Sequence, residues 1–481
     1  MHTSSRSKVN IIVSLFVTSS FCLALVISAR SAVQAAGPHI SLSPNHGHPS
    51  ASVKVSGSAF GVSETISISF DTTAIGTAIT DGTGAFTTKI TIPSSALPGT
   101  HTIQATGSIS GLTASASFLV QTDWPMFGLN AQHTHYNPYE NVLNTSNVSN
   151  LVVDWAATTG NFIDSSPTIV DGVAYIGSED GKLYAFNATT GAYVWSYADA
   201  TRSGINSSPA VINRIVYFGS DKSYAVNAKT GALIWSYNTG GIYASPVVVN
   251  GVVYIGSYGG NFYALNAATG VLIWSYNDPV GGFNSSPAVA NGVIYVGSND
   301  NKLYALNAVT GTYIWSYTTG GGIVSSPAIA SGVVYVGSTD NKLYGLKATT
   351  GAFLWSYATG RAIVSSPAVA YRTVYIGSDD NKLYALNAKT GAFLWSYTTQ
   401  NTVESSPALA NGVVYIGSAD NSVYAFNATT GVPLWSYATA SNIFSSPVVA
   451  SGILYIGSHD TSLYAFHLAG TTSEKIKGVV Q

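Results

Sequence analysis

Seven side chains that could bind a ligand or a partner stand shortly before the Ser-Pro pairs that recur in the C-terminal two thirds of the chain. They are Asp164, Arg202, Tyr243, Phe283, Arg361, Glu404 and Phe444. Loops on a rigid frame often carry binding residues, so we expect these side chains to line one end of the structure. Ordinary loop residues are the alternative interpretation. The acidic candidates Asp164 and Glu404 belong to separate repeats, which is a poor starting set for calcium, an ion that needs several carboxylates.

Two histidine pairs, His46 with His48 and His133 with His135, are spaced so that each pair could share a metal ion. No cysteine or third ligand lies near either pair in sequence, so we expect solvated loop histidines and no metal site. No serine is distinguished by a neighbouring histidine and aspartate, as a nucleophilic triad would require. The sequence therefore predicts no catalytic residue.

These residues are set in a repeat with a period of about 40 residues, the range typical of propellers and solenoids. Proline marks the repeats at Pro167, Pro209, Pro246, Pro287, Pro327, Pro367, Pro407 and Pro447. Tryptophan marks them at Trp155, Trp195, Trp235, Trp274, Trp315, Trp355, Trp395 and Trp435. Eight marks of each kind predict eight structural units.

Each repeat contains four short strand patterns separated by Gly, Asn, Asp and Ser. In the first repeat they are 165–170, 173–178, 182–187 and 192–197. Such short intervals favour an antiparallel meander, and no segment has the 3.6-residue period of a helix. The second strand is apolar without alternation, as expected for a strand covered on both faces. The first strand carries proline, which suits an innermost strand whose free edge faces a central channel.

The segment AFNATTGAYVW, from Ala185 to Trp195, resembles the tryptophan-docking motif A-x-D-x-x-T-G-x-x-x-W. That motif belongs to the pyrroloquinoline-quinone-like (PQQ-like) propeller repeat of quinoprotein alcohol dehydrogenases and BamB assembly lipoproteins. The resemblance covers roughly residues 122–468 and implies that each indole packs against the Ala and Thr-Gly of the neighbouring motif. The chain departs from the pattern by carrying Asn where Asp is usual. An Asn side chain can still cap the turn.

The eighth repeat lacks the final Thr-Gly-x-x-x-Trp, but a matching strand, Leu151–Trp155, precedes the first repeat. We expect this strand to complete the last sheet, because closure protects strand edges. The predicted fold is all-β: an eight-bladed β-propeller closed by the N-terminal strand at Trp155, preceded by an immunoglobulin-like (Ig-like) β-sandwich. We expect the sandwich over 37–121, a lead-in segment lying against the ring over 122–150, the propeller over 151–468 and a tail over 469–481.

Residues 1–36 have the pattern of an export signal, with Arg6 and Lys8 followed by an apolar run. An uncleaved membrane anchor is the alternative. After cleavage, 16 basic and 21 acidic residues and no cysteine would remain, which argues against nucleic-acid binding and thiol chemistry. We therefore expect a secreted or cell-surface protein, periplasmic in a two-membrane envelope, and a monomer.

Two functions remain open. The first is a non-catalytic scaffold of the cell envelope, whose variable loop face binds a surface protein or a glycan without a cofactor. The alternative, implied by the family resemblance, is a PQQ-dependent quinoprotein dehydrogenase with calcium and a catalytic Asp. The scattered carboxylates and the missing cysteines favour the first function.

Overall fold

The computed structural model describes residues 37–198, 201–278 and 280–470, and the predicted signal lies outside this part of the chain. The described residues are almost entirely β-strand, with one short 3-10 turn, η1 (Val148–Asn150). No helix in these ranges has the length and apolar character needed to cross a bilayer. The fold is therefore all-β, as predicted.

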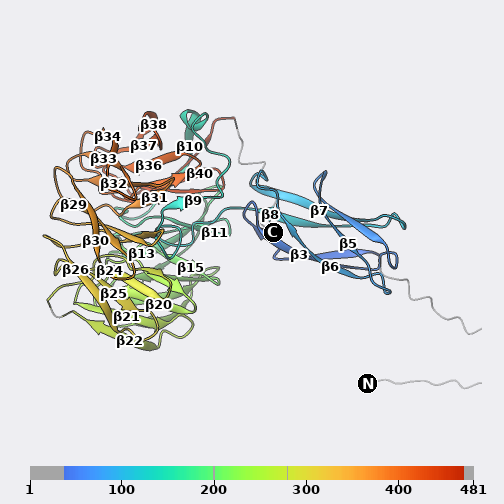
Figure 1. The fold of residues 1–481 in the computed structure, drawn as a ribbon, viewed down its shortest axis with the longest axis horizontal. Helices are drawn as coiled ribbons and strands as arrows, with labels where there is room; N and C mark the ends of the chain where they lie inside the picture. Colours follow the sequence, from blue (N-terminus) through green and yellow to red (C-terminus); the bar gives the residue numbers. More distant parts are fainter. Residues whose placement is uncertain (1–36, 199–200, 279, 471–481) are drawn as a thin grey trace, which may run out of the picture. The chain divides into compact units, whose positions relative to one another are not determined.

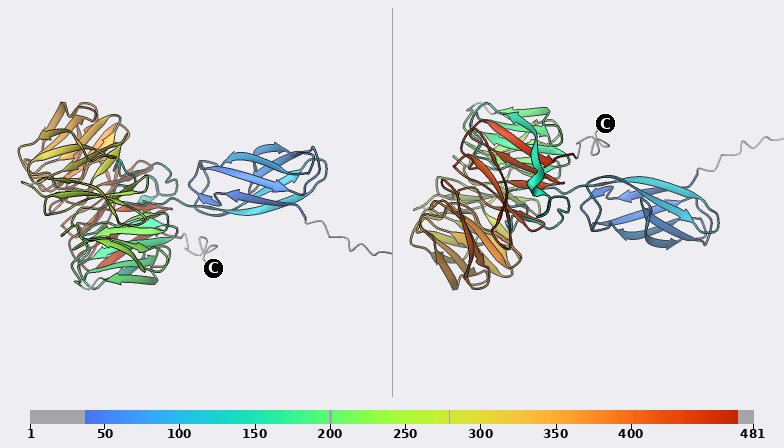
Figure 2. Two further views of the ribbon diagram at one scale, coloured as in Figure 1. Left: turned by 90° about the horizontal axis from the view of Figure 1, so that it is seen from below. Right: turned by 90° about the horizontal axis from the view of Figure 1, so that it is seen from above.

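Two sheets formed by residues 39–120 face each other and share one apolar core (Figure 2). One sheet has the order β1–β3–β6, and the other β2–β8–β7–β4–β5. Their bounds are β1 (His39–Ser43), β2 (His46–Gly47), β3 (Ser52–Ser58), β4 (Thr65–Phe70), β5 (Thr73–Ile79), β6 (Phe86–Thr91), β7 (Gly99–Gly107) and β8 (Thr113–Val120). The core forms because alternate residues of β3 and β4 point inward and are buried.

In the described residues after 150, the strands form eight four-stranded antiparallel sheets, and each sheet has a three-residue inner strand. One of these sheets gains a fifth, parallel strand, β9, from the segment before residue 150. The inner strands are β11 (Thr168–Val170), β15 (Ala210–Ile212), β19 (Val247–Val249), β23 (Ala288–Ala290), β27 (Ala328–Ala330), β31 (Ala368–Ala370), β35 (Ala408–Ala410) and β39 (Val448–Ala450). The prolines lie just before these strands and not within them. This placement leaves the inner ladders intact.

A closed ring of hydrogen bonds joins the inner ends of the eight sheets. The backbone N–H of the serine before each proline donates to the hydroxyl of the equivalent serine in the next sheet, over 2.8–3.1 Å. The order is Ser166, Ser208, Ser245, Ser286, Ser326, Ser366, Ser406 and Ser446, and Ser446 donates back to Ser166. The Ser-Pro marks of the sequence are thus the contacts that tie neighbouring sheets together.

The second strands are almost fully buried, as their unbroken apolar pattern predicts. They are β12 (Val173–Ser178), β16 (Ile215–Gly219), β20 (Val252–Gly256), β24 (Val293–Gly297), β28 (Val333–Gly337), β32 (Thr373–Ser378), β36 (Val413–Gly417) and β40 (Ile453–Gly457). The glycine near the end of each strand lies against the next sheet. A β-carbon on Gly297, for example, would collide with Ile323.

The third and outer strands complete each sheet. The third strands are β13 (Lys182–Asn187), β17 (Ser223–Asn227), β21 (Asn261–Asn266), β25 (Lys302–Asn307), β29 (Lys342–Lys347), β33 (Lys382–Asn387), β37 (Ser422–Asn427) and β41 (Ser462–Leu468). The outer strands are β10 (Leu151–Thr158), β14 (Tyr193–Ala198), β18 (Leu233–Tyr237), β22 (Leu272–Asn277), β26 (Tyr313–Thr318), β30 (Phe353–Ala358), β34 (Phe393–Thr398) and β38 (Pro433–Ala438). Seven tryptophans, from Trp155 to Trp395, donate to the Ala carbonyl of the next repeat over 2.9–3.3 Å.

The first outer strand joins the last repeat, as the sequence predicts. β10 pairs antiparallel with β41, with Val152 opposite His467 and Trp155 opposite Ala465, and it lies beside the last strands of the chain (Figure 1). The eighth repeat has no Thr-Gly turn, so Trp435 donates to the carbonyl of Leu151 instead. The Tyr415 hydroxyl, whose counterparts donate to Ala carbonyls, is buried without a partner. Both differences mark the join between the two ends of the repeat region.

The lead-in segment supplies hydrogen-bond partners to the inner strands. Backbone N–H groups of Val211, Val289, Ile329, Val369 and Leu409 donate to carbonyls between positions 125 and 135, over 2.6–2.9 Å. The segment ends in β9 (Tyr136–Asn137), which pairs parallel with β35. Trp124 and Ile169 of β11 also exchange backbone hydrogen bonds, at 2.8 and 3.1 Å. The prediction that the inner edges need no ladder partner is therefore wrong, because this segment binds six of them. The expectation that the segment lies against the propeller is confirmed.

Candidate functional site

One variable residue stands two positions before the serine of each Ser-Pro pair, and we call this set the mouth ring. Its members are Asp164, Asn206, Tyr243, Asn284, Val324, Val364, Glu404 and Phe444. Four of the seven predicted binding residues, namely Asp164, Tyr243, Glu404 and Phe444, belong to it. Because the serine ring fixes the backbone beneath it, the mouth ring holds its polar and apolar side chains on a rigid frame.

The other three predicted residues lie elsewhere. Phe283 is completely buried against Gly256 and Phe262, so its placement at the channel mouth is wrong, and Asn284 occupies that position. The third and fourth repeats differ in length, so the alignment of the repeats placed Phe283, one residue too early, at the position that Asn284 occupies. Arg202 and Arg361 are exposed and lie in the loops before β15 and β31, outside the mouth ring.

Two carboxylates and an amide meet at one side of the mouth ring. Glu179, in the turn between β12 and β13, accepts a hydrogen bond from the Asn206 side chain. Burial raises the pKa of Glu179, and the nearby charge of Asp164 raises it further. The Oδ1 atom of Asn206 is buried and has no hydrogen-bond partner. This group, the Glu179 cluster, thus has crowded negative charge and a free amide oxygen, which together suit a cation.

Glycine makes room for this arrangement. A β-carbon on Gly204 would lie 2.1 Å from an oxygen of the Glu179 carboxylate, so the loop backbone lies directly against that group. Sequence reasoning missed Glu179 because it considered only the residues before the inner strands. A second variable position, the residue that follows Gly-Ser at the end of the second strand, was the available signal. It carries Glu179, Tyr258, Asp379 and His459 in different repeats.

His459 lies beside the Glu179 cluster in an aromatic slot. Its Nε2 is 2.5 Å from Oδ1 of Asp164. Its ring stacks on Phe162, with centroids 4.8 Å apart and planes within 8°, and meets the edge of Phe444 at 4.8 Å. The imidazole is therefore held in one orientation by two rings and a carboxylate. A fixed orientation of this kind is what a hydrogen-bonding group of a binding or catalytic site requires.

Two further carboxylates, Glu404 of the mouth ring and Asp379 beside it, lie close to each other. Burial raises the pKa of Glu404, and Asp379 and Asp164 raise it further through their charges. Burial likewise raises the pKa of Asp379, while the charge of Arg361 lowers it. Repeats that are far apart in sequence are thus brought together, which the sequence interpretation did not expect of Asp164 and Glu404.

The donor types at the mouth fit a calcium-like or lanthanide-like cation, since carboxylate and amide oxygens are the ligands that such hard ions prefer. Within the described ranges, no three His, Cys, Asp or Glu side chains converge as a metal-binding group. In the Glu179 cluster the third donor is an amide, and its Oδ1 atom lacks any partner. The aromatic slot beside it offers flat surfaces for a planar cofactor.

His133 and His135 lie in the interior of the lead-in segment. Their side chains are 2% and 1% exposed, and both pack edge-on against Phe127. Burial lowers the pKa of each to about 3, so both imidazoles are neutral at pH 7. The expectation of solvated loop histidines is therefore wrong for this pair. His46 and His48 make separate contacts, with Asp171 and Tyr139.

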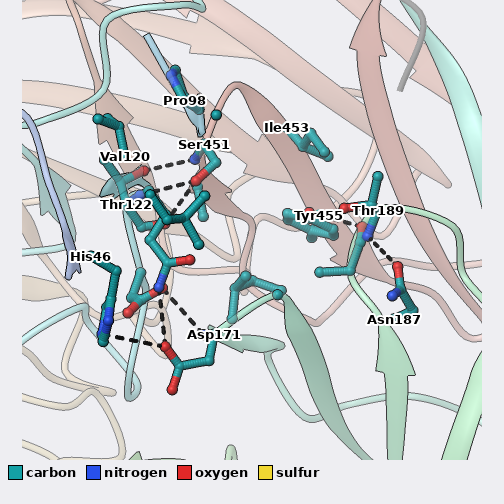
Figure 3. A pocket seen from close by; sticks show the side chains of 18 of the residues that line it. His46, Pro98, Val120, Thr122, Asp171, Asn187, Thr189, Ser451, Ile453 and Tyr455 are labelled. Atoms are coloured by element: carbon teal, nitrogen blue, oxygen red, sulfur yellow. Dashed lines mark hydrogen bonds and ion pairs between the residues drawn. The ribbon is translucent and has the colours of Figure 1, made fainter. Parts of the chain in front are cut away.

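A cavity of about 310 Å³ lies around Thr122, Asp171 and Ser451 (Figure 3). Its polar groups bind one another: the N–H of Thr122 donates to the Ser451 hydroxyl, and the N–H of Ser451 donates to that of Thr122, at 2.9 and 2.7 Å. Gln121 donates to Asp171 at 3.1 Å. With these groups already paired, the cavity offers less free bonding capacity than the mouth.

Asp123 at this cavity should make stability depend on pH. Burial, together with the charge of Asp171, raises its pKa to about 6. Between the ordinary value of 3.8 and about 6 the folded protein binds more protons than the unfolded chain, so the free energy of unfolding falls as pH rises. The total loss should be up to about 3 kcal/mol. Urea unfolding at pH 4 and pH 7 should show this loss in the parent and not in Asp123→Asn; equal pH dependence in both proteins would contradict the assignment.

Models of two protein families match the repeat region. One covers residues 148–275 and is described as outer membrane protein assembly factor BamB. The other covers residues 242–480 and is described as the β-propeller of beta-alanine-activating enzyme. Together with the repeated docking motif, these matches identify the repeat region as a PQQ-like, BamB-like β-propeller.

Individual relatives extend the comparison. The chain is 33% identical over 104 residues to a quinohemoprotein alcohol dehydrogenase of Comamonas testosteroni, a match covering 21% of this chain and 14% of that protein. A europium-containing methanol dehydrogenase has a similar fold, with TM-score 0.64 and 15% identity, covering 72% of this chain and 98% of the other. BamB of Moraxella catarrhalis matches with TM-score 0.57 and 19% identity, covering 66% and 99%. The sequence match thus spans about one seventh of the length of the Comamonas testosteroni enzyme.

These comparisons overturn part of the functional prediction. We expected a non-catalytic envelope scaffold without a cofactor. The relative from Comamonas testosteroni, however, is named a quinohemoprotein alcohol dehydrogenase. The predictions of a scaffold, of no enzymatic activity and of no cofactor are corrected accordingly. The error arose because the mouth carboxylates were judged by their separation in sequence.

Proposed function

We propose that this protein is a quinoprotein-type dehydrogenase that oxidises an alcohol with pyrroloquinoline quinone and a bound hard cation. The observation that carries the proposal is the Glu179 cluster: the Asn206 amide donates to Glu179, the charge of Asp164 raises the pKa of Glu179, and Asn206 Oδ1 is buried without a partner. Asp164, Glu179 and Asn206 would hold the cation. The aromatic slot of Phe162, His459 and Phe444 would lie against the flat cofactor.

In this proposal His459 is the base and the Glu179 cluster holds the cation. A bound quinone would supply the two-electron oxidation, in which the carbon-bound hydrogen of the alcohol leaves as a hydride equivalent. His459 would take the hydroxyl proton at Nδ1, because its Nε2–H donates to Asp164, which would stabilise the positive charge, and its ring is stacked on Phe162. The Glu179 cluster orients the cation, and the serine ring keeps these groups at fixed positions.

Reconstitution tests the proposal. The purified chain, loaded with calcium or a lanthanide and with the quinone, should reduce a dye in the presence of a primary alcohol, and a chelator should abolish the reaction. Glu179→Gln should lower this activity by at least about 100-fold, because it removes a cation ligand. Asp379→Asn is the matched control, since it also removes a partly buried carboxyl from the mouth but not from the cluster. Absence of quinone-dependent activity, or equal losses in the two variants, would refute the assignment.

The proposal includes the arrangement of the whole chain. The eight sheets are taken as eight blades of one ring, an interpretation supported by the serine ring and by the pairing of β10 with β41. Residues 37–121 are taken as an Ig-like sandwich, 122–150 as the lead-in and 151–468 as the propeller, between a signal over 1–36 and a tail over 469–481. Export to the envelope or the cell surface agrees with the BamB match.

A further inference from the structure

A polar pocket of about 330 Å³ opens beside the mouth, over the first three repeats of the propeller. Its walls come from the loops before β15 and β19 and from the turns that join second to third strands. Ile242 is buried at its base, while Tyr243 and Tyr258 are 54% and 63% exposed. The two tyrosine rings meet edge to face, with centroids 6.1 Å apart.

A shortened turn distinguishes this place from the rest of the propeller. Five positions separate Gly219 from Tyr224 in the second repeat, whereas seven separate Gly177 from Tyr184 in the first. The turn between β16 and β17, beside the pocket, is therefore two residues shorter. In the third repeat, Tyr258 replaces the smaller residues that other repeats carry after Gly-Ser. The pocket therefore arises from sequence changes confined to two neighbouring repeats.

The lining is rich in hydrogen-bond acceptors. Glu179 and Asp221 contribute carboxylates, of which Asp221 accepts from the Tyr224 hydroxyl at 2.7 Å and Glu179 from Asn206. Asn206 contributes an Oδ1 atom that is buried without a partner. The Ser220 hydroxyl already donates to the carbonyl of Ser203 at 3.0 Å, which leaves its oxygen as an acceptor. A ligand that satisfies this lining must offer several donors at short spacing. Its carbon frame must also present C–H groups to exposed tyrosine faces.

We propose that this pocket binds a small polyhydroxylated compound, a polyol or a monosaccharide. Adjacent hydroxyl groups donate to the carboxylates and to Asn206, and the C–H face lies on Tyr258 and Tyr243. A volume of about 330 Å³ is of the size that small-molecule sites require. As a substrate site the pocket rests on the proposed function, because it shares Glu179 and Asn206 with the cation cluster; as a binding site it does not.

Binding should be measured on the full chain treated with chelator and free of quinone. D-glucose, D-xylose and D-sorbitol should each give saturable binding by calorimetry or saturation-transfer NMR, whereas ethanol and propylamine should bind far more weakly. Tyr258→Ala should weaken sugar binding by about tenfold, the loss expected from one stacking ring. Tyr193→Ala is the matched control, because Tyr193 is 61% exposed on the distant edge strand β14.

The outcomes separate this inference from the proposed function. Sugar binding that depends on Tyr258, without any quinone-dependent activity, would support the pocket and refute the dehydrogenase. Activity on simple alcohols with no sugar binding would refute the pocket alone. Preferred binding of propylamine would overturn the inference in favour of a cation-selective site, and equal effects of Tyr258→Ala and Tyr193→Ala would overturn it as well.

Discussion

Cysteines introduced together at Val152 and His467, in a Cys22→Ser background, are expected to form a disulfide that raises the free energy of unfolding by about 4–5 kcal/mol. The two residues lie directly opposite each other where β10 pairs with β41. Opposed residues of antiparallel strands are close enough for such a bond. The gain is large because the bond closes a loop of about 315 residues in the unfolded chain, which removes much of its entropy.

Comparison of oxidised and reduced protein by urea unfolding measures this gain, and non-reducing electrophoresis measures the extent of bond formation. Val152→Cys with Ile314→Cys is the control, since Ile314 is exposed to the same degree but lies on β26, in another sheet. Efficient bond formation in the control, or failure in the Val152 and His467 variant, would contradict closure of the repeat region by its first strand.

Replacement of Trp315 by Ala should lower the free energy of unfolding by about 3–5 kcal/mol, the cost of removing a large buried ring. The indole is 8% exposed and donates to the carbonyl of Ala348 at 3.0 Å. Its ring covers Gly351, where an added β-carbon would lie 2.6 Å from the ring. The residue thus fastens the fourth repeat to the fifth, and its loss leaves a cavity between two sheets.

Trp315→Phe separates packing from hydrogen bonding. It keeps an aromatic ring, and Tyr295 continues to donate to Ala348 at 3.1 Å, so the loss should stay below about 2 kcal/mol. Urea unfolding followed by circular dichroism gives both values. If Trp315→Ala unfolds within 1 kcal/mol of the parent, the tryptophans do not hold the sheets together to the extent that the contacts imply.

Most of the fold could be predicted because the sequence of each repeat contains the local signals for its strands and turns. Strand lengths, Gly-containing turns and the Trp motif are local signals, and eight copies strengthen each of them. The missing eighth Trp and the strand at Trp155 also predicted the pairing of β10 with β41. The lead-in was harder, because its carbonyls bind backbone groups up to about 270 residues away, as at His135 and Leu409. Backbone contacts of that kind leave no side-chain pattern to read.

The site could be predicted only in part. Asp164 and Glu404 were recognised as mouth residues, but the sequence could not show that closure of the repeat region brings them near each other and near His459. Glu179 and Asn206 were missed because they share ordinary turn and loop patterns with their repeats. Phe283 was misplaced because two neighbouring repeats differ in length. Sites at the centre of a ring depend on which repeats become neighbours, and local patterns do not contain that information.

The most direct test of the proposed function is anomalous diffraction from crystals soaked with europium(III) and pyrroloquinoline quinone. The account predicts one strong europium peak among the oxygens of Asp164, Glu179 and Asn206, with the quinone density beside Phe162 and His459. The peak should vanish in Glu179→Gln and persist in Asp379→Asn. No peak at the mouth, or a peak bound only by surface carboxylates elsewhere, would contradict the account.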